Sequence, residues 1–186
     1  MRRILVLLLL CTGVVAAAPS AFAQDMVCNG SFGAATVGSL TVPPNGACSL
    51  SGTKVNGNIT VQANATLTAE DVVVRGNIQS DGAASVSVSG SMVRGGIQVS
   101  RGGSADLSTS TALGNATFTE NAGPVDVNGN RIGGSLQADG NTGGVTISEN
   151  RIRNNLQCSD NDPAPSGGGN VVGGNKSGQC AGLSSM

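Results

Sequence analysis

The sequence predicts an all-β, single-domain parallel β-helix (a β-solenoid) of about eight coils of roughly 19–20 residues. A motif of the form aliphatic-x-Gly-Asn-aliphatic returns at a nearly constant interval, and short runs of alternating apolar and polar residues separate its copies. The chain also has no Trp, no Tyr and three Phe, and a narrow core of Val, Ile, Leu and Ala needs no aromatic residues. A leucine-rich repeat of similar length requires several Leu per unit and a helical return, which these units lack.

The first 23 residues have the three regions of a secretory signal peptide. Arg2 and Arg3 give a positively charged start, residues 4–10 are apolar, and residues 21–23 form a small-residue cleavage site. We therefore expect a mature chain that begins near Gln24 and is secreted, to the cell surface or to the extracellular space. No later window has the roughly 20 apolar residues that a membrane span needs. Residues 24–35 are predicted to form an N-terminal cap.

Removal of this peptide leaves eight Lys and Arg residues against eleven Asp and Glu residues, a net charge of about −3. From this net charge we expect no attraction of the chain to nucleic acid or to anionic lipid. The chain has no His, and no residue spacing matches a metal site, a phosphate loop or a nucleophile–base pair. The sequence therefore predicts no catalytic residue, no metal and no cofactor.

The predicted β-helix covers residues 36–180 and contains eight copies of the motif. The copies begin at Thr36, Val55, Val74, Val93, Ala112, Ile132, Ile152 and Val172. Equivalent residues of successive coils stack about 4.8 Å apart, so the residues from Val55 onward are expected to form an inward ladder. A polar file follows the apolar end of each motif and is expected to face outward. This file comprises Thr41, Thr60, Gln79, Gln98, Thr117, Gln137 and Gln157.

Glycine and amide residues mark the predicted corners of the coils. The motif glycines, Gly76 and Gly95 among them, are expected to supply a positive φ at a corner. Another set of small polar residues recurs at the same interval and is expected to form a hydrogen-bonded corner ladder. Its members are Ser91, Ser110, Asn130, Asn150 and Asn170.

Four cysteines remain after residue 23, an even number in a chain bound for an oxidising compartment. Two disulfides are therefore expected. Pairing of sequence neighbours, Cys28 with Cys48 and Cys158 with Cys180, is favoured over the two crossed arrangements. Each pair lies near one end of the rod, where unpaired strand edges need protection. Residues 159–170 are predicted as a C-terminal cap loop, and residues 181–186 as a tail.

Two carboxylates are the leading candidates for a binding site. Asp106 and Asp126 occupy equivalent positions of adjacent coils, where they could bind a cation or act as an acid–base pair. The alternative is a solvated polar face, neutralised by Arg131 and Arg151 around the corner. These two arginines also fit a basic stripe for an acidic glycan, together with Arg75, Arg94 and Arg153.

Three groups of proteins resemble parts of this chain. The units VNGNI, VRGNI and IGGSL resemble the bactofilins, whose polymer-forming cores are β-helices of Gly-rich repeats. The runs VDVNGNRI and VTISENRI resemble the right-handed parallel β-helix repeats of the pectate-lyase and NosD-like group. The terminal run NLQCSDNDPAPSGGGNVVGGNKSGQC is similar to the ends of small secreted proteins of actinobacterial type that are generally labelled hypothetical.

From these observations we expect a non-enzymatic structural or binding protein, exported to the cell surface or beyond. The expected partners are a cell-envelope or extracellular glycan, or further copies of the chain. One alternative is a self-assembling polymer subunit, as the bactofilin resemblance implies. The other is a degenerate polysaccharide lyase or hydrolase, as the pectate-lyase resemblance implies.

Overall fold

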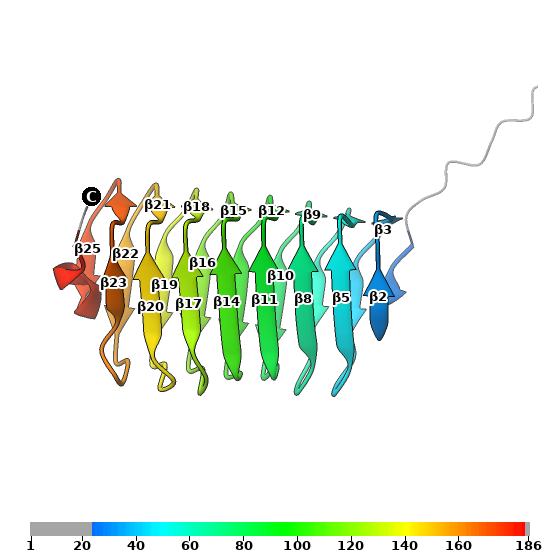
Figure 1. The fold of residues 1–186 in the computed structure, drawn as a ribbon, viewed down its shortest axis with the longest axis horizontal. Helices are drawn as coiled ribbons and strands as arrows, with labels where there is room; N and C mark the ends of the chain where they lie inside the picture. The colour runs from blue at the N-terminus through cyan, green and yellow to red at the C-terminus, as the bar shows by residue number, and fades with distance from the viewer. Residues whose placement is uncertain (1–23, 185–186) are drawn as a thin grey trace, which may run out of the picture.

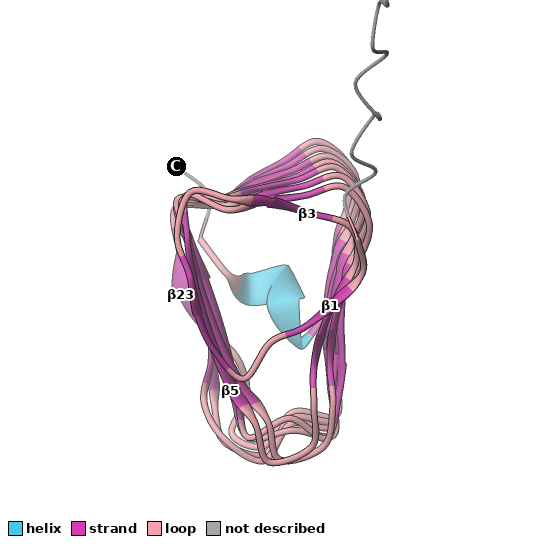
Figure 2. Ribbon diagram, turned by 90° about the vertical axis from the view of Figure 1, so that its right-hand side faces the viewer, coloured by secondary structure: helices cyan, strands magenta, loops and turns pink. Residues whose placement is uncertain are grey.

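The computed structural model describes residues 24–184 and confirms the predicted parallel β-solenoid (Figure 1). The predicted signal peptide, residues 1–23, lies outside the described residues. Each of eight coils contributes one short strand to each of three parallel sheets, and β25 (Lys176–Gly178) adds a ninth strand to one of them. The sheets run along the rod as the sides of a roughly triangular prism (Figure 2).

The three sheets are named by the order in which the chain enters them. The first sheet contains β1 (Met26–Val27), β4 (Leu40–Val42), β7 (Ile59–Val61), β10 (Ile78–Asp81), β13 (Ile97–Ser100), β16 (Ala116–Thr119), β19 (Leu136–Asp139), β22 (Leu156–Ser159) and β25 (Lys176–Gly178). The second sheet contains β2 (Gly30–Phe32), β5 (Ala47–Ser51), β8 (Thr66–Glu70), β11 (Ser85–Ser89), β14 (Ser104–Ser108), β17 (Val125–Asn128), β20 (Val145–Ser148) and β23 (Ser166–Gly168). The third sheet contains β3 (Thr36–Val37), β6 (Lys54–Val55), β9 (Val73–Val74), β12 (Met92–Val93), β15 (Thr111–Ala112), β18 (Arg131–Ile132), β21 (Arg151–Ile152) and β24 (Val171–Val172).

The register between coils is the one that the repeat predicts. Val55 pairs with Val74, and Ile132 with Ile152, so the predicted aliphatic ladder lies on the inner side of the third sheet. The Thr and Gln file is also confirmed, on the outer side of the first sheet.

The core is narrow, and its largest fully buried side chain is Phe118. Phe118 pairs with Ala138 of the next coil, so a small neighbour leaves room for the aromatic ring.

The solenoid extends further at both ends than the sequence predicts. Residues 24–35, predicted as a cap, contain β1 and β2, and β2 pairs in register with β5. The predicted cap loop 159–170 contains β23, which pairs with β20. These strands are short, and the sequences GSF and SGG do not show the apolar alternation that marks the other coils.

The C-terminal end of the rod is covered by a short 3₁₀ helix, η1 (Gln179–Gly182). Figure 2 shows η1 lying across the cross-section of the prism. Cys180 in η1 is fully buried and forms a disulfide with Cys158 of β22, with 5.2 Å between the two Cα atoms. The other disulfide joins Cys28 to Cys48, with 5.5 Å between their Cα atoms. The predicted pairing of sequence neighbours is confirmed.

The motif glycines are required for a different reason from the one that the sequence suggests. Gly76 and Gly95 do not adopt a positive φ. A Cβ atom at Gly76 would lie 2.2 Å from Oδ1 of Asn58 in the preceding coil, so close approach between coils excludes a side chain. The left-handed residues lie at the other corners, where they include Gly129 (φ 67°) and Glu149 (φ 57°).

Candidate functional site

The predicted corner ladder is present and buried between the second and third sheets. Oδ1 of Asn150 accepts hydrogen bonds from the backbone N–H of Asn130 (2.9 Å) and from its Nδ2 (3.0 Å). Nδ2 of Asn150 donates to the Val127 carbonyl (2.8 Å) and to Oδ1 of Asn170 (3.0 Å). Each asparagine therefore satisfies polar groups of two neighbouring coils. This corner ladder stabilises the fold, and its burial leaves no surface for a ligand.

A second buried ladder, which was not predicted from the sequence, lies at the corner between the first and second sheets. Asn121, Asn141 and Asn161 repeat the same pattern, with N–H to Oδ1 distances of 3.0 Å between successive members. Gln179 of η1 ends this ladder by accepting from the N–H of Asn161 at 2.9 Å. The 20-residue interval between these asparagines was a signal that could have revealed the ladder.

The carboxylate pair lies on the outer face of the second sheet. Asp106 of β14 and Asp126 of β17 are partners in register, as predicted. The hydroxyl of Ser108 donates to Oδ1 of Asp106 at 3.1 Å, and that of Ser87 at 3.5 Å. Neither carboxylate forms an ion pair with an arginine within residues 24–184. These groups sit on an open sheet surface with hydroxyl neighbours.

The two predicted arginines lie on another side of the prism, in the third sheet. Arg131 of β18 and Arg151 of β21 are partners in register. The predicted neutralisation of Asp106 and Asp126 by these arginines does not occur, because the corner ladder separates the two surfaces. With Arg153 they line an open hollow of about 510 Å³, which Leu113 and Val171 also line.

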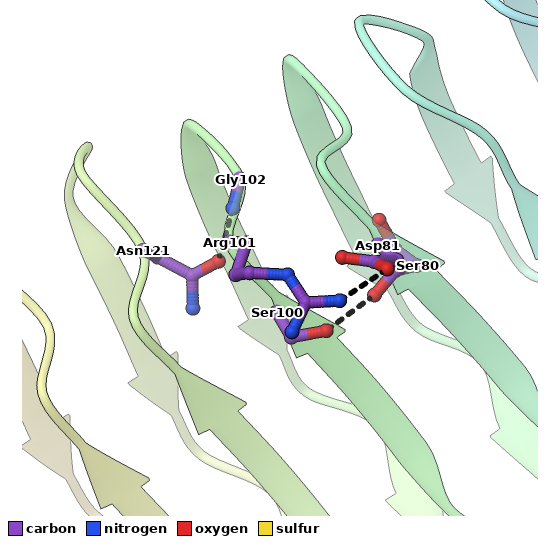
Figure 3. A network of polar contacts seen from close by, with 6 residues as sticks. All are labelled: Ser80, Asp81, Ser100, Arg101, Gly102 and Asn121. Carbon is purple, nitrogen blue, oxygen red and sulfur yellow. Dashed lines mark hydrogen bonds and ion pairs between the residues drawn. The ribbon is translucent and has the colours of Figure 1, made fainter.

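A further polar cluster borders a hollow of about 490 Å³ on the first sheet (Figure 3). The Arg101 guanidinium donates to the Asp81 carboxylate, and this hydrogen bond, followed by the charge of Asp81, raises the pKa of Arg101. The Ser100 hydroxyl donates to the Ser80 carbonyl at 3.1 Å. Both charged side chains are more than half exposed, so the ion pair contributes little to stability.

Residues 24–184 contain no group of three or more His, Cys, Asp or Glu side chains placed to hold a metal ion. No helix in this part of the chain has the length and apolar character needed to cross a membrane.

Comparison of the chain with protein-family models, with curated proteins and with solved structures found no match.

Proposed function

We propose that this protein is an exported, non-enzymatic β-solenoid rod whose flat outer faces serve as a rigid structural or binding surface. One observation carries the proposal: the outward side chains form unbroken files along the rod. The Thr and Gln file runs in register from β4 to β22 without a long loop to interrupt it. Such a surface suits an extended partner, whereas enzyme sites are usually concave pockets.

The two disulfides support the exported state, since such bonds persist in oxidising compartments. The test is expression of the whole chain in a host with a secretory pathway, followed by N-terminal sequencing and thiol titration of the exported product. We expect a mature chain that begins near Gln24 and has no free thiol. Retention of an uncleaved chain with reduced cysteines inside the cell would contradict export.

The non-enzymatic part of the proposal is tested with the same oxidised protein. We expect binding without turnover on a panel of neutral and uronate polysaccharides that represents envelope and extracellular glycans. The matched variant is Asp106→Ala with Asp126→Ala, which removes the carboxylate pair. Cleavage of a uronate polymer that disappears in this variant would establish the polysaccharide-acting alternative.

A self-assembling polymer subunit is the second candidate, and the N-terminal end of the rod favours it. Within residues 24–184, β1, β2 and β3 each pair with one neighbour only. Edges of this kind can pair with another chain. Concentration-dependent growth of the oxidised mature chain in light scattering, with filaments in negative-stain images, would place this candidate first.

A further inference from the structure

The fold gathers most of the basic residues of the chain on one side of the rod. Of the eight Lys and Arg residues that follow residue 23, six lie on the outer side of the third sheet or directly after its strands, where all six are exposed. They are Lys54, Arg75, Arg94, Arg131, Arg151 and Arg153. We call this surface, formed by the outward residues of the third sheet and the residue after each strand, the arginine face.

The arginine face carries no acidic residue. Its nearest acids in the sequence, Asp71 and Glu149, occupy the corner that precedes the face. The residue after each strand belongs to the same surface, because its N–H group continues the backbone hydrogen bonding of the third sheet. The N–H of Arg153, for example, donates to the Ile132 carbonyl at 2.9 Å. A chain whose net charge is negative thus presents one side on which every charged side chain is cationic.

Exposed apolar side chains share this face. Leu113 is 55% exposed, Met92 44% and Val171 42%, and these are three of the five large hydrophobic residues exposed in the described part of the chain. Leu113 and Val171 line the same hollow as Arg131, Arg151 and Arg153. Guanidinium groups and aliphatic side chains therefore line the same hollow.

The arginines on this face are not explained by internal pairing. Arg131 and Arg151 stand directly opposite each other, and like charges in that position destabilise a sheet. Their guanidinium groups form no hydrogen bond or ion pair within residues 24–184. The equivalent position of the preceding coil holds the neutral Thr111, so the fold itself does not require a cation here.

We propose that the arginine face docks the rod lengthwise on an anionic phospholipid surface, with a phosphate headgroup among Arg131, Arg151 and Arg153. Arginine binds phosphate through paired hydrogen bonds, and a flat basic face with exposed aliphatic residues is the combination that an anionic membrane interface attracts. An acidic glycan fits the charge but gains nothing from Leu113, Met92 and Val171. The inference rests on the proposed export, since it names the partner of the exported rod.

The test is flotation of the oxidised mature chain with vesicles of phosphatidylcholine alone or mixed with phosphatidylglycerol. We expect binding to the mixed vesicles that weakens as salt rises. Arg131→Thr with Arg151→Thr should weaken it roughly thirtyfold, because each basic residue near an anionic surface contributes about a factor of five. Gln98→Glu with Gln157→Glu changes the net charge equally on the first sheet and should leave binding within about twofold.

Leu113→Asn distinguishes lipid from a soluble polyanion. Asn56 occupies the position equivalent to Leu113 three coils earlier, so an asparagine side chain suits this place in the fold. We expect about fivefold weaker vesicle binding from lost apolar insertion and no change in binding to polygalacturonate.

Equal binding to both vesicle types, no binding to either, or insensitivity to the arginine or leucine substitutions would overturn the lipid proposal. Polygalacturonate binding without vesicle binding would assign the face to an acidic glycan instead.

Unfolding measurements separate this role from a structural one. In the absence of vesicles at low salt, Arg151→Thr should raise or preserve the melting temperature, because it removes a like-charge pair. A clear fall in melting temperature would mean that Arg151 serves the fold, and would overturn the assignment. The vesicle-binding and unfolding measurements both use the purified mature chain, so their outcomes do not depend on export. N-terminal sequencing of the secreted product tests export separately.

Discussion

Asn150 shows, at the scale of a single residue, how the rod holds its coils together. It is fully buried, and its side chain accepts from Asn130 and donates to the Val127 carbonyl and to Asn170. Asn150→Leu would leave the buried Asn130 N–H without its acceptor and would remove the side-chain hydrogen bond to the Val127 carbonyl. A buried donor without an acceptor costs about 1–3 kcal/mol, so we expect a loss of at least that size in the free energy of unfolding, measured by denaturant titration.

Asn150→Ser is the matched control for this substitution. Serine occupies the equivalent ladder position at Ser110, where its hydroxyl accepts from the Ser91 N–H at 3.0 Å and donates to the Ser108 carbonyl at 2.8 Å. The serine variant should therefore lose less stability than the leucine variant. Equal losses would show that side-chain volume, rather than hydrogen bonding, decides the stability of the ladder.

At the scale of the element, the C-terminal disulfide has a task that the N-terminal one does not share. Cys158–Cys180 fastens η1 across the end of the rod, whereas Cys28–Cys48 joins neighbouring coils. Removing Cys158 and Cys180 together by substitution with Ala should free η1, uncover the edge of β25 and cause association. The measurement is light scattering coupled to size exclusion.

The matched control replaces Cys28 and Cys48 with Ala. This variant should lose stability, by about 3 kcal/mol if loop entropy dominates, but gain no new tendency to associate relative to the parent chain. Association that follows both replacements equally would mean that reduced stability, and not the loss of the η1 cover, exposes the edges.

The elements also show what the sequence can predict. The ladders from Val55 to Val172 and the pairing of Asn130 with Asn150 follow from the period alone, because in-register stacking turns a sequence interval into a contact. β2 and β23 escaped prediction because their few residues include glycines and lack apolar alternation. The arginine face was not predicted from the sequence, because the net charge of a chain does not show which charged residues lie on the same side of the rod.

At the scale of the whole molecule, each coil contacts its neighbours, and the rod should behave as a linear array. Deletion of residues 131–150 joins Asn130 to Arg151 and removes one complete 20-residue period. We expect a folded rod, shorter by about 4.8 Å, that melts at a lower temperature because one interface between coils is lost. Circular dichroism and small-angle scattering measure the two quantities.

Deletion of residues 131–140 is the control, since it removes half a period. It joins Asn130, at the corner between the second and third sheets, to Asn141, at the corner between the first and second sheets. Every following residue is then shifted to the wrong sheet. We expect this shorter deletion to abolish cooperative unfolding, although it removes fewer residues. If the two deletions were equally damaging, the coils would not be interchangeable, and the stability of the rod would depend on a particular central segment rather than on the repeat.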